Sequence, residues 1–433
     1  MQLSTRIEQQ KRQKNKQKSS NMRMKYLLLL ALSFVIQHVE AQRSTNQSSN
    51  WVGVIVLDTK DKDAAVPFNM EIRRSKQKIA SITVKTANDR IEVKEIEQHG
   101  DSTLIKMPVF ISEITFKEKK DSLVGRYYPK GKSKGPSYAF YAVKNKSDRF
   151  YWHTDKPQFN ISGRWKYIVN PTSATPDTLV AEFKQQGARF TGALLDPTGD
   201  MRYLEGKISG NQFYMSGFDG GRTSIFRATI ASSSAIEGGT MMTSIAYKPS
   251  WKAIKDSNAK IAESKDIIRV KEGIKTFKFA VKDLEGKPFT SDDPSLKGKV
   301  VVVQASGSWC PNCLDDTRLF QKLHEKYNAK GLEVVSLMFE ENDLKSSRYR
   351  IERFVSQTGA KYRFYYAGPR SKKNKDEVLY PLEGVVAFPT TIFIDKKGEI
   401  RKVHTGFSGP GTGSHYEKLV EEITTTLEEL LKE

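Results

Sequence analysis

Cysteine is scarce in this chain, and its scarcity narrows what the protein can be. The 433 residues include two cysteines, Cys310 and Cys313, separated by two residues. One such pair does not make a disulfide-stapled scaffold, and a bridge that closes so small a loop would restrain little chain entropy. Six histidines, none of them in an HxxH-like pair, leave too few ligands for a structural zinc site, so we expect no metal. The pair is therefore expected to serve chemistry rather than structure.

Long hydrophobic runs are also missing. The apolar stretch Leu27–Ile36 has ten residues, whereas a bilayer-spanning helix needs about 20. It follows the basic residue Lys25 and leads to a small-residue cleavage pattern at Ala41, which is typical of a secretory signal. We expect residues 1–41 to be a signal peptide with a basic N-terminal extension, and the mature protein to be periplasmic or otherwise exported, without a transmembrane span. An uncleaved anchor is the alternative, and either Met24 is the true start or the basic region is long.

Acidic residues are outnumbered by basic ones. The chain has 71 Lys and Arg against 50 Asp and Glu, which gives a formal net charge of +21. The basic residues are scattered among acids, and no basic stripe with interleaved aromatic residues occurs. This pattern fits a solvated basic surface better than a nucleic-acid groove. We expect no nucleic-acid partner, while attraction to an acidic partner or a membrane surface stays open.

Residues 45–248 alternate between apolar and polar positions with period two, as in Ile79–Val84 and Met201–Gly206. Turn sequences rich in Gly, Asp and Asn separate these segments at short intervals. Many short strands with such spacing predict an all-β antiparallel barrel or sandwich, with an up-and-down meander in its later part. Its aromatic residues fit a core better than a binding face. We interpret the charged stretch 249–275 as a linker.

The two cysteines lie where a strand gives way to a helix. Lys299–Gln304 is a β-branched apolar run bounded by glycines, which predicts a buried strand, and the apolar spacing after Cys313 predicts a helix. Cys310 would face the free N–H groups of the first helical turn, where the helix dipole favours an anion. Because a thiolate attacks in disulfide exchange, Cys310 is predicted as the nucleophile and Cys313 as the resolving thiol. Two inert cysteines are the weaker interpretation beside Trp309 and Pro311.

Strands and helices alternate over residues 276–433. Leu332–Phe339 is predicted as a second buried strand, and Ala387–Asp395 with Ile400–His404 as a hairpin. Tyr416–Leu431 has the spacing of an amphipathic last helix. This order predicts an α/β domain with a mixed sheet and helices on both faces.

The motifs of this C-terminal domain resemble those of a known superfamily. The run Trp309–Cys313 (WCPNC) after a buried strand, Phe388–Ile400 (FPTTIFIDKKGEI) and His404–Leu419 (HTGFSGPGTGSHYEKL) are similar to thioredoxin superfamily motifs. Over residues 270–433 the chain resembles the exported TlpA/ResA-like thiol–disulfide oxidoreductases, in particular their two-domain Bacteroidetes-type versions. The resemblance implies a thioredoxin fold and no cofactor other than the redox-active pair itself.

The resemblance also implies roles for residues near the cysteines. Pro389 matches the family's cis-proline, which would sit opposite the pair and let the backbone of Phe388 bind an extended client strand. Thr390 comes next in the same motif. Asp316 stands where relatives carry a glutamate, so its carboxyl group could move the proton of the resolving thiol Cys313. An ordinary exposed or helix-capping acid is the alternative for Asp316.

The implied function is an exported thiol–disulfide oxidoreductase of cell redox homeostasis, with antioxidant activity, acting as a reductase or isomerase on protein thiols and disulfides. A membrane partner would donate the electrons. Trp309 is expected to shape the site and Pro311 to tune its reduction potential, and Gln304 replaces the buried aspartate of thioredoxins proper. The alternatives are an oxidant that inserts disulfides and a binding protein whose β-domain carries the function. Peroxidase chemistry is disfavoured, because Val303 and Gly307 occupy the Pro and Thr/Ser positions of the peroxidatic motif.

Overall fold

The computed structural model describes residues 46–61, 63–76, 78–131, 135–384 and 386–433. The predicted signal peptide, residues 1–41, lies outside these ranges. The chain divides into two compact units, and the larger one, residues 50–71 and 82–433, contains every site discussed below. Of the smaller unit, residues 46–49 and 72–81 are described, apart from residue 77.

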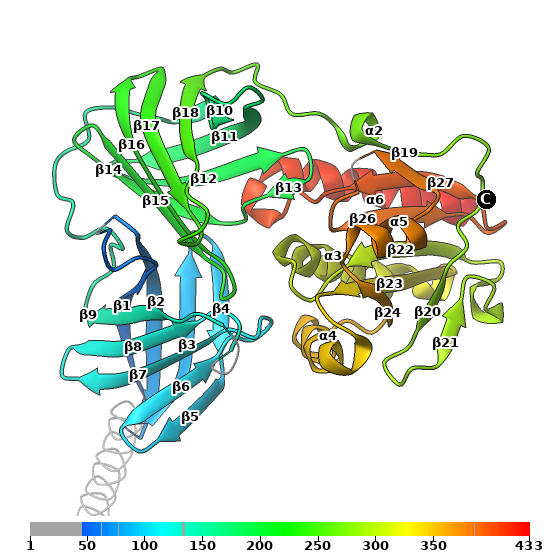
Figure 1. Cartoon of the computed structure of the whole chain (residues 1–433), viewed down its shortest axis with the longest axis horizontal. Helices are drawn as coiled ribbons and strands as arrows, with labels where there is room; N and C mark the ends of the chain where they lie inside the picture. Colours follow the sequence, from blue (N-terminus) through cyan, green and yellow to red (C-terminus); the bar gives the residue numbers. More distant parts are fainter. Residues whose placement is uncertain (1–45, 62, 77, 132–134, 385) are drawn as a thin grey trace, which may run out of the picture. The chain divides into compact units, whose positions relative to one another are not determined.

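The first nine strands form one sheet, drawn in blue to teal in Figure 1. They are β1 Asn46–Val56, β2 Ala65–Ser75, β3 Lys78–Thr86, β4 Asp89–Val93, β5 Glu95–His99, β6 Ser102–Lys106, β7 Glu113–Lys119, β8 Ser122–Tyr128 and β9 Tyr138–Lys144. The strand order is β4-β3-β2-β1-β9-β8-β7-β6-β5, and β5 to β9 pair antiparallel as a meander. Buried and less buried side chains alternate along β7, for example, as the period-two pattern predicts.

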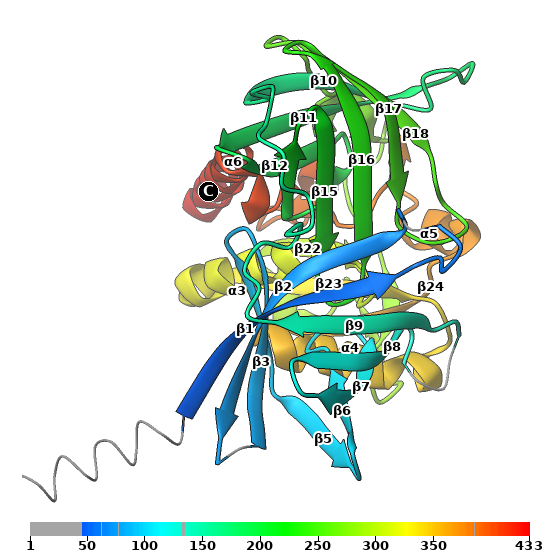
Figure 2. The ribbon, with the colours of Figure 1, turned by 90° about the vertical axis from the view of Figure 1, so that its left-hand side faces the viewer.

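The next strands form a closed antiparallel barrel (Figure 1, Figure 2). They are β10 Gly163–Val169, β11 Asp177–Gln186, β12 Arg189–Asp196, β13 Gly199–Asp200, β14 Leu204–Ser209, β15 Gln212–Phe218, β16 Thr223–Ser232, β17 Ala235–Met242 and β18 Ser250–Lys255. The ring runs β10-β11-β12-β14-β15-β16-β17-β18 and returns to β10. Trp165, Phe183, Phe213 and Trp251 fill its interior. The all-β prediction is confirmed, with a barrel and a separate sheet where the sequence indicated a single barrel or sandwich.

Part of the predicted linker, 249–275, is a strand. Residues 250–255 form β18, which closes the barrel by pairing with β10 and β17 and buries Trp251 and Ala253. The sequence interpretation missed this strand because it is short and charged, and the exposed Ile254 beside the buried Ala253 interrupts the period of two. The remainder includes α2 Ser264–Ile267 and β19 Ile268–Val270.

The C-terminal part is a seven-stranded mixed sheet with helices. Its elements are β20 Ala280–Lys282, β21 Pro288–Thr290, η1 Pro294–Leu296, β22 Val300–Ser306, α3 Pro311–Tyr327, η2 Asn328–Lys330, β23 Leu332–Glu340, α4 Leu344–Thr358, β24 Arg363–Pro369, α5 Lys372–Val378, β25 Leu382–Gly384, β26 Thr390–Ile394, β27 Ile400–Thr405, η3 Pro410–Thr412 and α6 Ser414–Lys432. The order is β21-β20-β24-β23-β22-β26-β27, while β25 pairs with β19. Strand β22 runs parallel to β23 and antiparallel to β26, which is the predicted α/β architecture.

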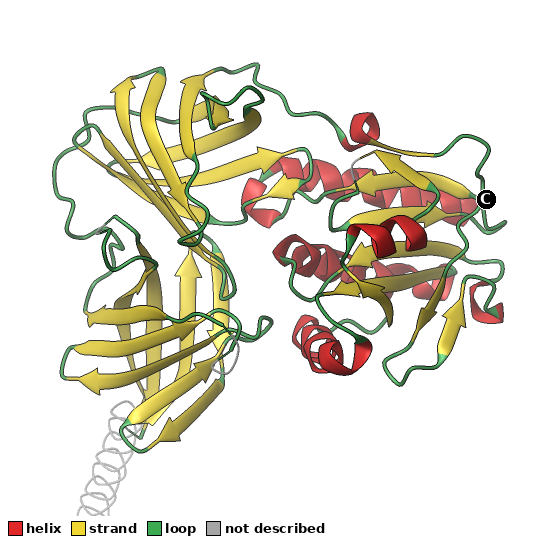
Figure 3. Cartoon of the chain, viewed as in Figure 1, coloured by secondary structure: helices red, strands yellow, loops and turns green. Residues whose placement is uncertain are grey.

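Strand β22 is buried along its whole length, because layers cover both faces of the sheet (Figure 3). Helices α3, α4 and α6 pack on one face through residues such as Phe320, Phe354 and Leu427. The extended segment around Phe277 and the end of α5 near Leu379 cover the other face. The carboxyl end of β22 leads directly into the start of α3, and this junction positions the site. Among the described residues, no helix has the length and apolar character needed to cross a membrane.

Candidate redox site

Helix α3 begins at the cysteine pair. Cys310 is its N-cap residue, and the Cys310 Sγ accepts a hydrogen bond from the backbone N–H of Cys313 at 3.2 Å. Pro311 occupies the first turn, where its missing N–H costs no hydrogen bond. Both thiols are free, with Cys310 5% exposed and Cys313 fully buried. The thiol of Cys310 therefore has the N–H-rich helix terminus and the better access to a partner.

The loop before Cys310 is fixed from β23. The backbone N–H and hydroxyl of Ser308 both donate to the carboxylate of Glu340 at 2.8 Å. The indole of Trp309 donates to the carbonyl of Phe339 at 2.8 Å. A Cβ on Gly307 would lie 2.4 Å from the indole nitrogen, so this close packing requires glycine. These contacts hold the Trp309 ring rigidly beside the thiol pair.

The proline loop lies across from the helix terminus. The Phe388–Pro389 peptide bond is cis, and the thiol of Cys310 donates to the Phe388 carbonyl at 3.5 Å. The Phe388 ring meets that of Trp309 edge-on, with the ring centroids 5.4 Å apart. The hydroxyl of Thr390 donates to the Ala387 carbonyl at 2.7 Å, which closes the loop on itself. The structure thus brings together the residues that the resemblance singled out around Cys310.

A buried polar cluster lies beneath the resolving thiol. Burial raises the pKa of Asp316 to about 8, although the side-chain amide of Gln304 donates to its carboxylate. Burial also raises the pKa of Cys313 well above its usual value, and the nearby Cys310 and Asp316 add to the rise. At neutral pH, Asp316 is therefore mostly a neutral carboxylic acid, unlike the exposed or capping acid that its position also allowed.

Sequence reasoning missed the other members of this cluster. Four buried polar atoms near Asp316 lack a hydrogen-bond partner within the described ranges: Gln304 Oε1, Ser306 Oγ, Thr317 Oγ1 and Tyr362 OH. Burial and the neighbouring Asp316 raise the pKa of the Tyr362 phenol. A polar Gln304 at the end of an otherwise apolar strand was the one sequence signal for such a cluster.

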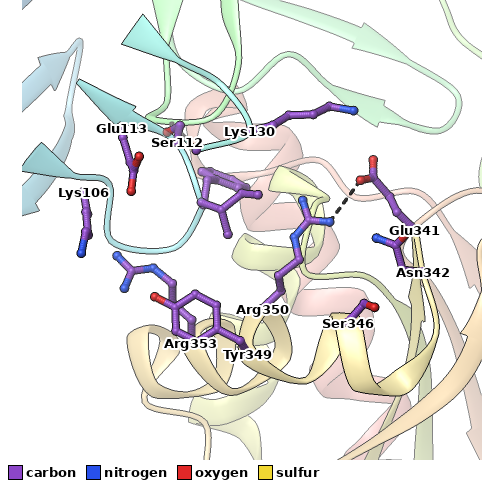
Figure 4. Close-up of a pocket in the computed structure, with 13 residues that line it drawn as sticks. Lys106, Ser112, Glu113, Lys130, Glu341, Asn342, Ser346, Tyr349, Arg350 and Arg353 are labelled. Carbon is purple, nitrogen blue, oxygen red and sulfur yellow. Dashed lines mark hydrogen bonds and ion pairs between the residues drawn. The ribbon is translucent and has the colours of Figure 1, made fainter. Parts of the chain in front are cut away.

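A separate cavity of about 550 Å³ contains neither cysteine (Figure 4). Its charged lining residues are Lys106, Glu113, Lys130, Glu341, Arg350 and Arg353. Arg350 pairs with Glu341 at 3.1 Å, and Arg353 pairs with Glu95 at 2.7 Å. Because these cations already have carboxylate partners, we assign no ligand to the cavity and base the function on the cysteine pair.

A cysteine pair at the start of a helix, following an inner strand of a mixed sheet and facing a cis-proline loop, defines a thioredoxin-fold protein with a dithiol centre. The Redoxin family model matches residues 269–420. The chain is 33% identical over 122 residues to thiol-disulfide oxidoreductase ResA of Bacillus thuringiensis strain Al Hakam, a match that spans 28% of this chain and 62% of that relative. ResA of B. thuringiensis subsp. konkukian is 32% identical over 146 residues, or 34% of this chain and 75% of the relative.

Among solved structures, a thiol:disulfide interchange protein of the DsbE type from Chlorobium tepidum matches at 25% identity, 37% of this chain and 99% of that one, with a TM-score of 0.29. The chain belongs to the ResA-like thiol–disulfide oxidoreductases of the thioredoxin superfamily. These matches cover the C-terminal domain, and the first two ResA relatives are matched over less than two thirds of their length.

Proposed function

We propose that the protein exchanges disulfides with client proteins through Cys310 and Cys313, as an exported reductase or isomerase. The observation that carries this proposal is the position of Cys310 at the N-cap of α3. There its sulfur accepts the Cys313 N–H at 3.2 Å and stays the more accessible of the two thiols. A negative charge on sulfur is favoured at such a terminus.

The reaction runs in two steps. The Cys310 thiolate attacks one sulfur of a client disulfide, which forms a mixed disulfide and releases the other client thiolate. Cys313 then loses its proton and attacks the Cys310 sulfur, which forms the Cys310–Cys313 disulfide and frees the second client thiolate. The client gains two electrons and two protons, and the cysteine pair loses the same. Phe388 and Pro389 support this role, because the Phe388 carbonyl lies 3.5 Å from the attacking sulfur, where an extended client strand would align.

Asp316 accepts the proton that Cys313 loses in the second step. With a pKa of about 8, the carboxyl is neutral in most molecules at pH 7, while its ionised form can accept a proton from Cys313. In the reverse direction the neutral form returns the proton to the Cys313 sulfur.

Export and electron supply belong to the same proposal. The secretory pattern of residues 1–41 supports export, and an exported dithiol that reduces clients must be regenerated by a donor of two electrons. We propose a membrane-bound partner as that donor. No cofactor is needed beyond the cysteine pair, because thiol–disulfide exchange is complete without one.

The test compares Cys310→Ser and Cys313→Ser in the full-length chain, with a disulfide-containing protein as client. Cys313→Ser is expected to accumulate a mixed disulfide with the client, since the second step is blocked, while Cys310→Ser forms none. Disulfide exchange that persists in Cys310→Ser would overturn the proposal. Equilibration in glutathione or dithiothreitol buffers then measures the reduction potential of the cysteine pair. A value of about −270 mV would indicate a reductase, and a value of about −120 mV would indicate an oxidant.

A further inference from the structure

A hairpin of the barrel reaches the redox helix. Strands β12 and β13 lead to Arg202, whose guanidinium binds both carboxylate oxygens of Asp315 on α3, at 2.8 and 3.0 Å. Both side chains are 4% exposed. Arg202 adopts φ 57°, a left-handed conformation that is unusual for a residue other than glycine. A charge-paired, buried and conformationally unusual arginine is held by its surroundings rather than by chance contact.

The same hairpin also binds the cysteine motif itself. The side-chain amide of Asn312, between the two cysteines, lies against the backbone of Asp200. In the amide orientation that satisfies both of its atoms, it donates to the Asp200 carbonyl at 3.3 Å and accepts from the Asp200 N–H at 3.1 Å. The Asp200 carboxylate accepts the backbone N–H of Gly409. The barrel therefore contacts α3 at Asn312 and Asp315, on either side of Cys313.

The glycine-rich segment between β27 and α6 makes this docking possible. A Cβ on Gly406 would lie 2.6 Å from the backbone of Thr198 on the hairpin, and one on Gly411 would lie 3.2 Å from the backbone of Arg202. On the hairpin side, a Cβ on Gly199 would lie 2.1 Å from the Asn312 amide. The sequence GFSGPGTG thus has a physical role in the close approach of barrel and redox domain.

The ion pair between Arg202 and Asp315 affects the electrostatics at Cys310. Asp315 follows Cys313 by two residues, so its carboxylate shares the helix terminus that favours the Cys310 thiolate, and an uncompensated negative charge there would oppose it. Arg202 supplies the compensating charge. The other charged groups around this pair are Arg318, 3.6 Å from Asp315, Asp89 and Asp219, each 4.0 Å from Arg202, and Asp200, a buried carboxyl whose pKa burial raises to about 6. Arg318 is about half exposed, so water screens its charge more than that of Arg202.

We propose that Arg202 is a positioning residue of the redox site: from the barrel, it neutralises Asp315 and, with Asp200, fixes Asn312, so that no unbalanced charge opposes the negative charge that forms on Cys310 during disulfide exchange. The inference rests on the proposed function, and it gives the β-barrel domain a part in the chemistry. Removing Arg202 takes away a positive charge, whereas removing Asp315 takes away a negative one. The two substitutions should therefore change the reactivity of Cys310 in opposite directions.

The test measures the alkylation rate of reduced Cys310 by iodoacetamide against pH, in the full-length chain. Arg202→Met is expected to slow alkylation at pH 7 about fivefold and move the profile to higher pH, because the buried Asp315 carboxylate is left without its partner at the same helix terminus. Asp315→Asn is expected to speed alkylation and move the profile to lower pH. The double variant should return close to the parent, and it also carries the test if Arg202→Met fails to fold.

Arg353→Met is the matched control. Arg353 also joins α4 to the β-region, through Glu95 and the Met107 carbonyl, but it lies away from the cysteines. It is expected to leave the alkylation profile unchanged. An equal effect of Arg353→Met, or shifts of the same sign in Arg202→Met and Asp315→Asn, would overturn the inference. If the parent protein itself showed no disulfide exchange, the proposed function would be refuted instead. The failure of the inference and the failure of the proposed function can therefore be told apart.

Discussion

Asp316→Asn is expected to change how the stability of the protein depends on pH. The Asp316 carboxyl is fully buried, and burial raises its pKa from 3.8 to about 8. Well below pH 3.8 the group is neutral in both the folded and the unfolded state. As the pH rises towards 8, the unfolded chain ionises while the folded protein keeps the proton, so the free energy of unfolding falls. Above pH 8 the whole penalty is present.

The size of this effect follows from the shift. At about 1.4 kcal/mol per pKa unit, a rise from 3.8 to about 8 corresponds to a loss of at most about 6 kcal/mol between about pH 3 and about pH 9. This is comparable with the whole stability of a typical domain, about 5–15 kcal/mol. Asparagine keeps the shape and the contact with Gln304 but does not titrate, so Asp316→Asn should lose this dependence and be the more stable protein at pH 9.

Urea titrations of the reduced protein at pH 5, 7 and 9 measure the effect as a shift in the unfolding midpoint. Asp343→Asn is the control, whose effect on stability should stay the same from pH 5 to pH 9. Asp343 caps α4, and its hydrogen bonds from Ser346 lower its pKa. Its contribution is present at neutral pH and lost as the pH falls through the folded pKa. Parallel stability curves for the parent and Asp316→Asn between pH 6 and 9 would refute the buried-acid reasoning.

Three further outcomes are expected. Asp316→Asn should slow resolution of the mixed disulfide by Cys313, and the pH dependence of that step near 8 should disappear; stopped-flow measurement with an unchanged profile would exclude Asp316 as the proton acceptor. Gly307→Ala should cost about 1–3 kcal/mol in urea unfolding, because its Cβ would lie 2.4 Å from the Trp309 indole nitrogen. Trp165→Ala should destabilise the barrel by about 3–5 kcal/mol, since this fully buried ring fills the interior; a smaller loss would mean that the interior collapses around the gap.

The redox junction could be predicted because its signals are local. A β-branched run ending in glycine, a Cys-Pro-Asn-Cys sequence and helical apolar spacing lie within one stretch of chain, and each fixes its own backbone conformation. β22 and α3 accordingly lie where the pattern put them. The strands of the β-region were also visible as alternation, but which strand pairs with which depends on contacts far apart in sequence.

The contact between Arg202 and Asp315 could not be predicted for the same reason. The two residues are 113 positions apart, and Arg202 lies in a turn sequence that indicates only the end of a strand. The sequence singled out Asp316 from the family's spacing, while its neighbour Asp315 gave no signal of its own. Only the folded chain shows that Asp315 faces the barrel and Asp316 faces the resolving thiol.

These two consecutive carboxyl groups show how a helix can carry acids next to a cysteine that is proposed to attack as a thiolate. Adjacent residues of a helix point about 100° apart, so the two groups meet different surroundings. Asp316 enters the core, where burial holds it in the neutral form at pH 7. Asp315 points to the barrel, where Arg202 balances its charge. Protonation removes the charge of Asp316, and the ion pair with Arg202 balances the charge of Asp315. The helix terminus can therefore stabilise a negative charge on Cys310. Because Arg202 belongs to the barrel hairpin, the charge balance at the start of α3 depends on the contact between that hairpin and Asp315.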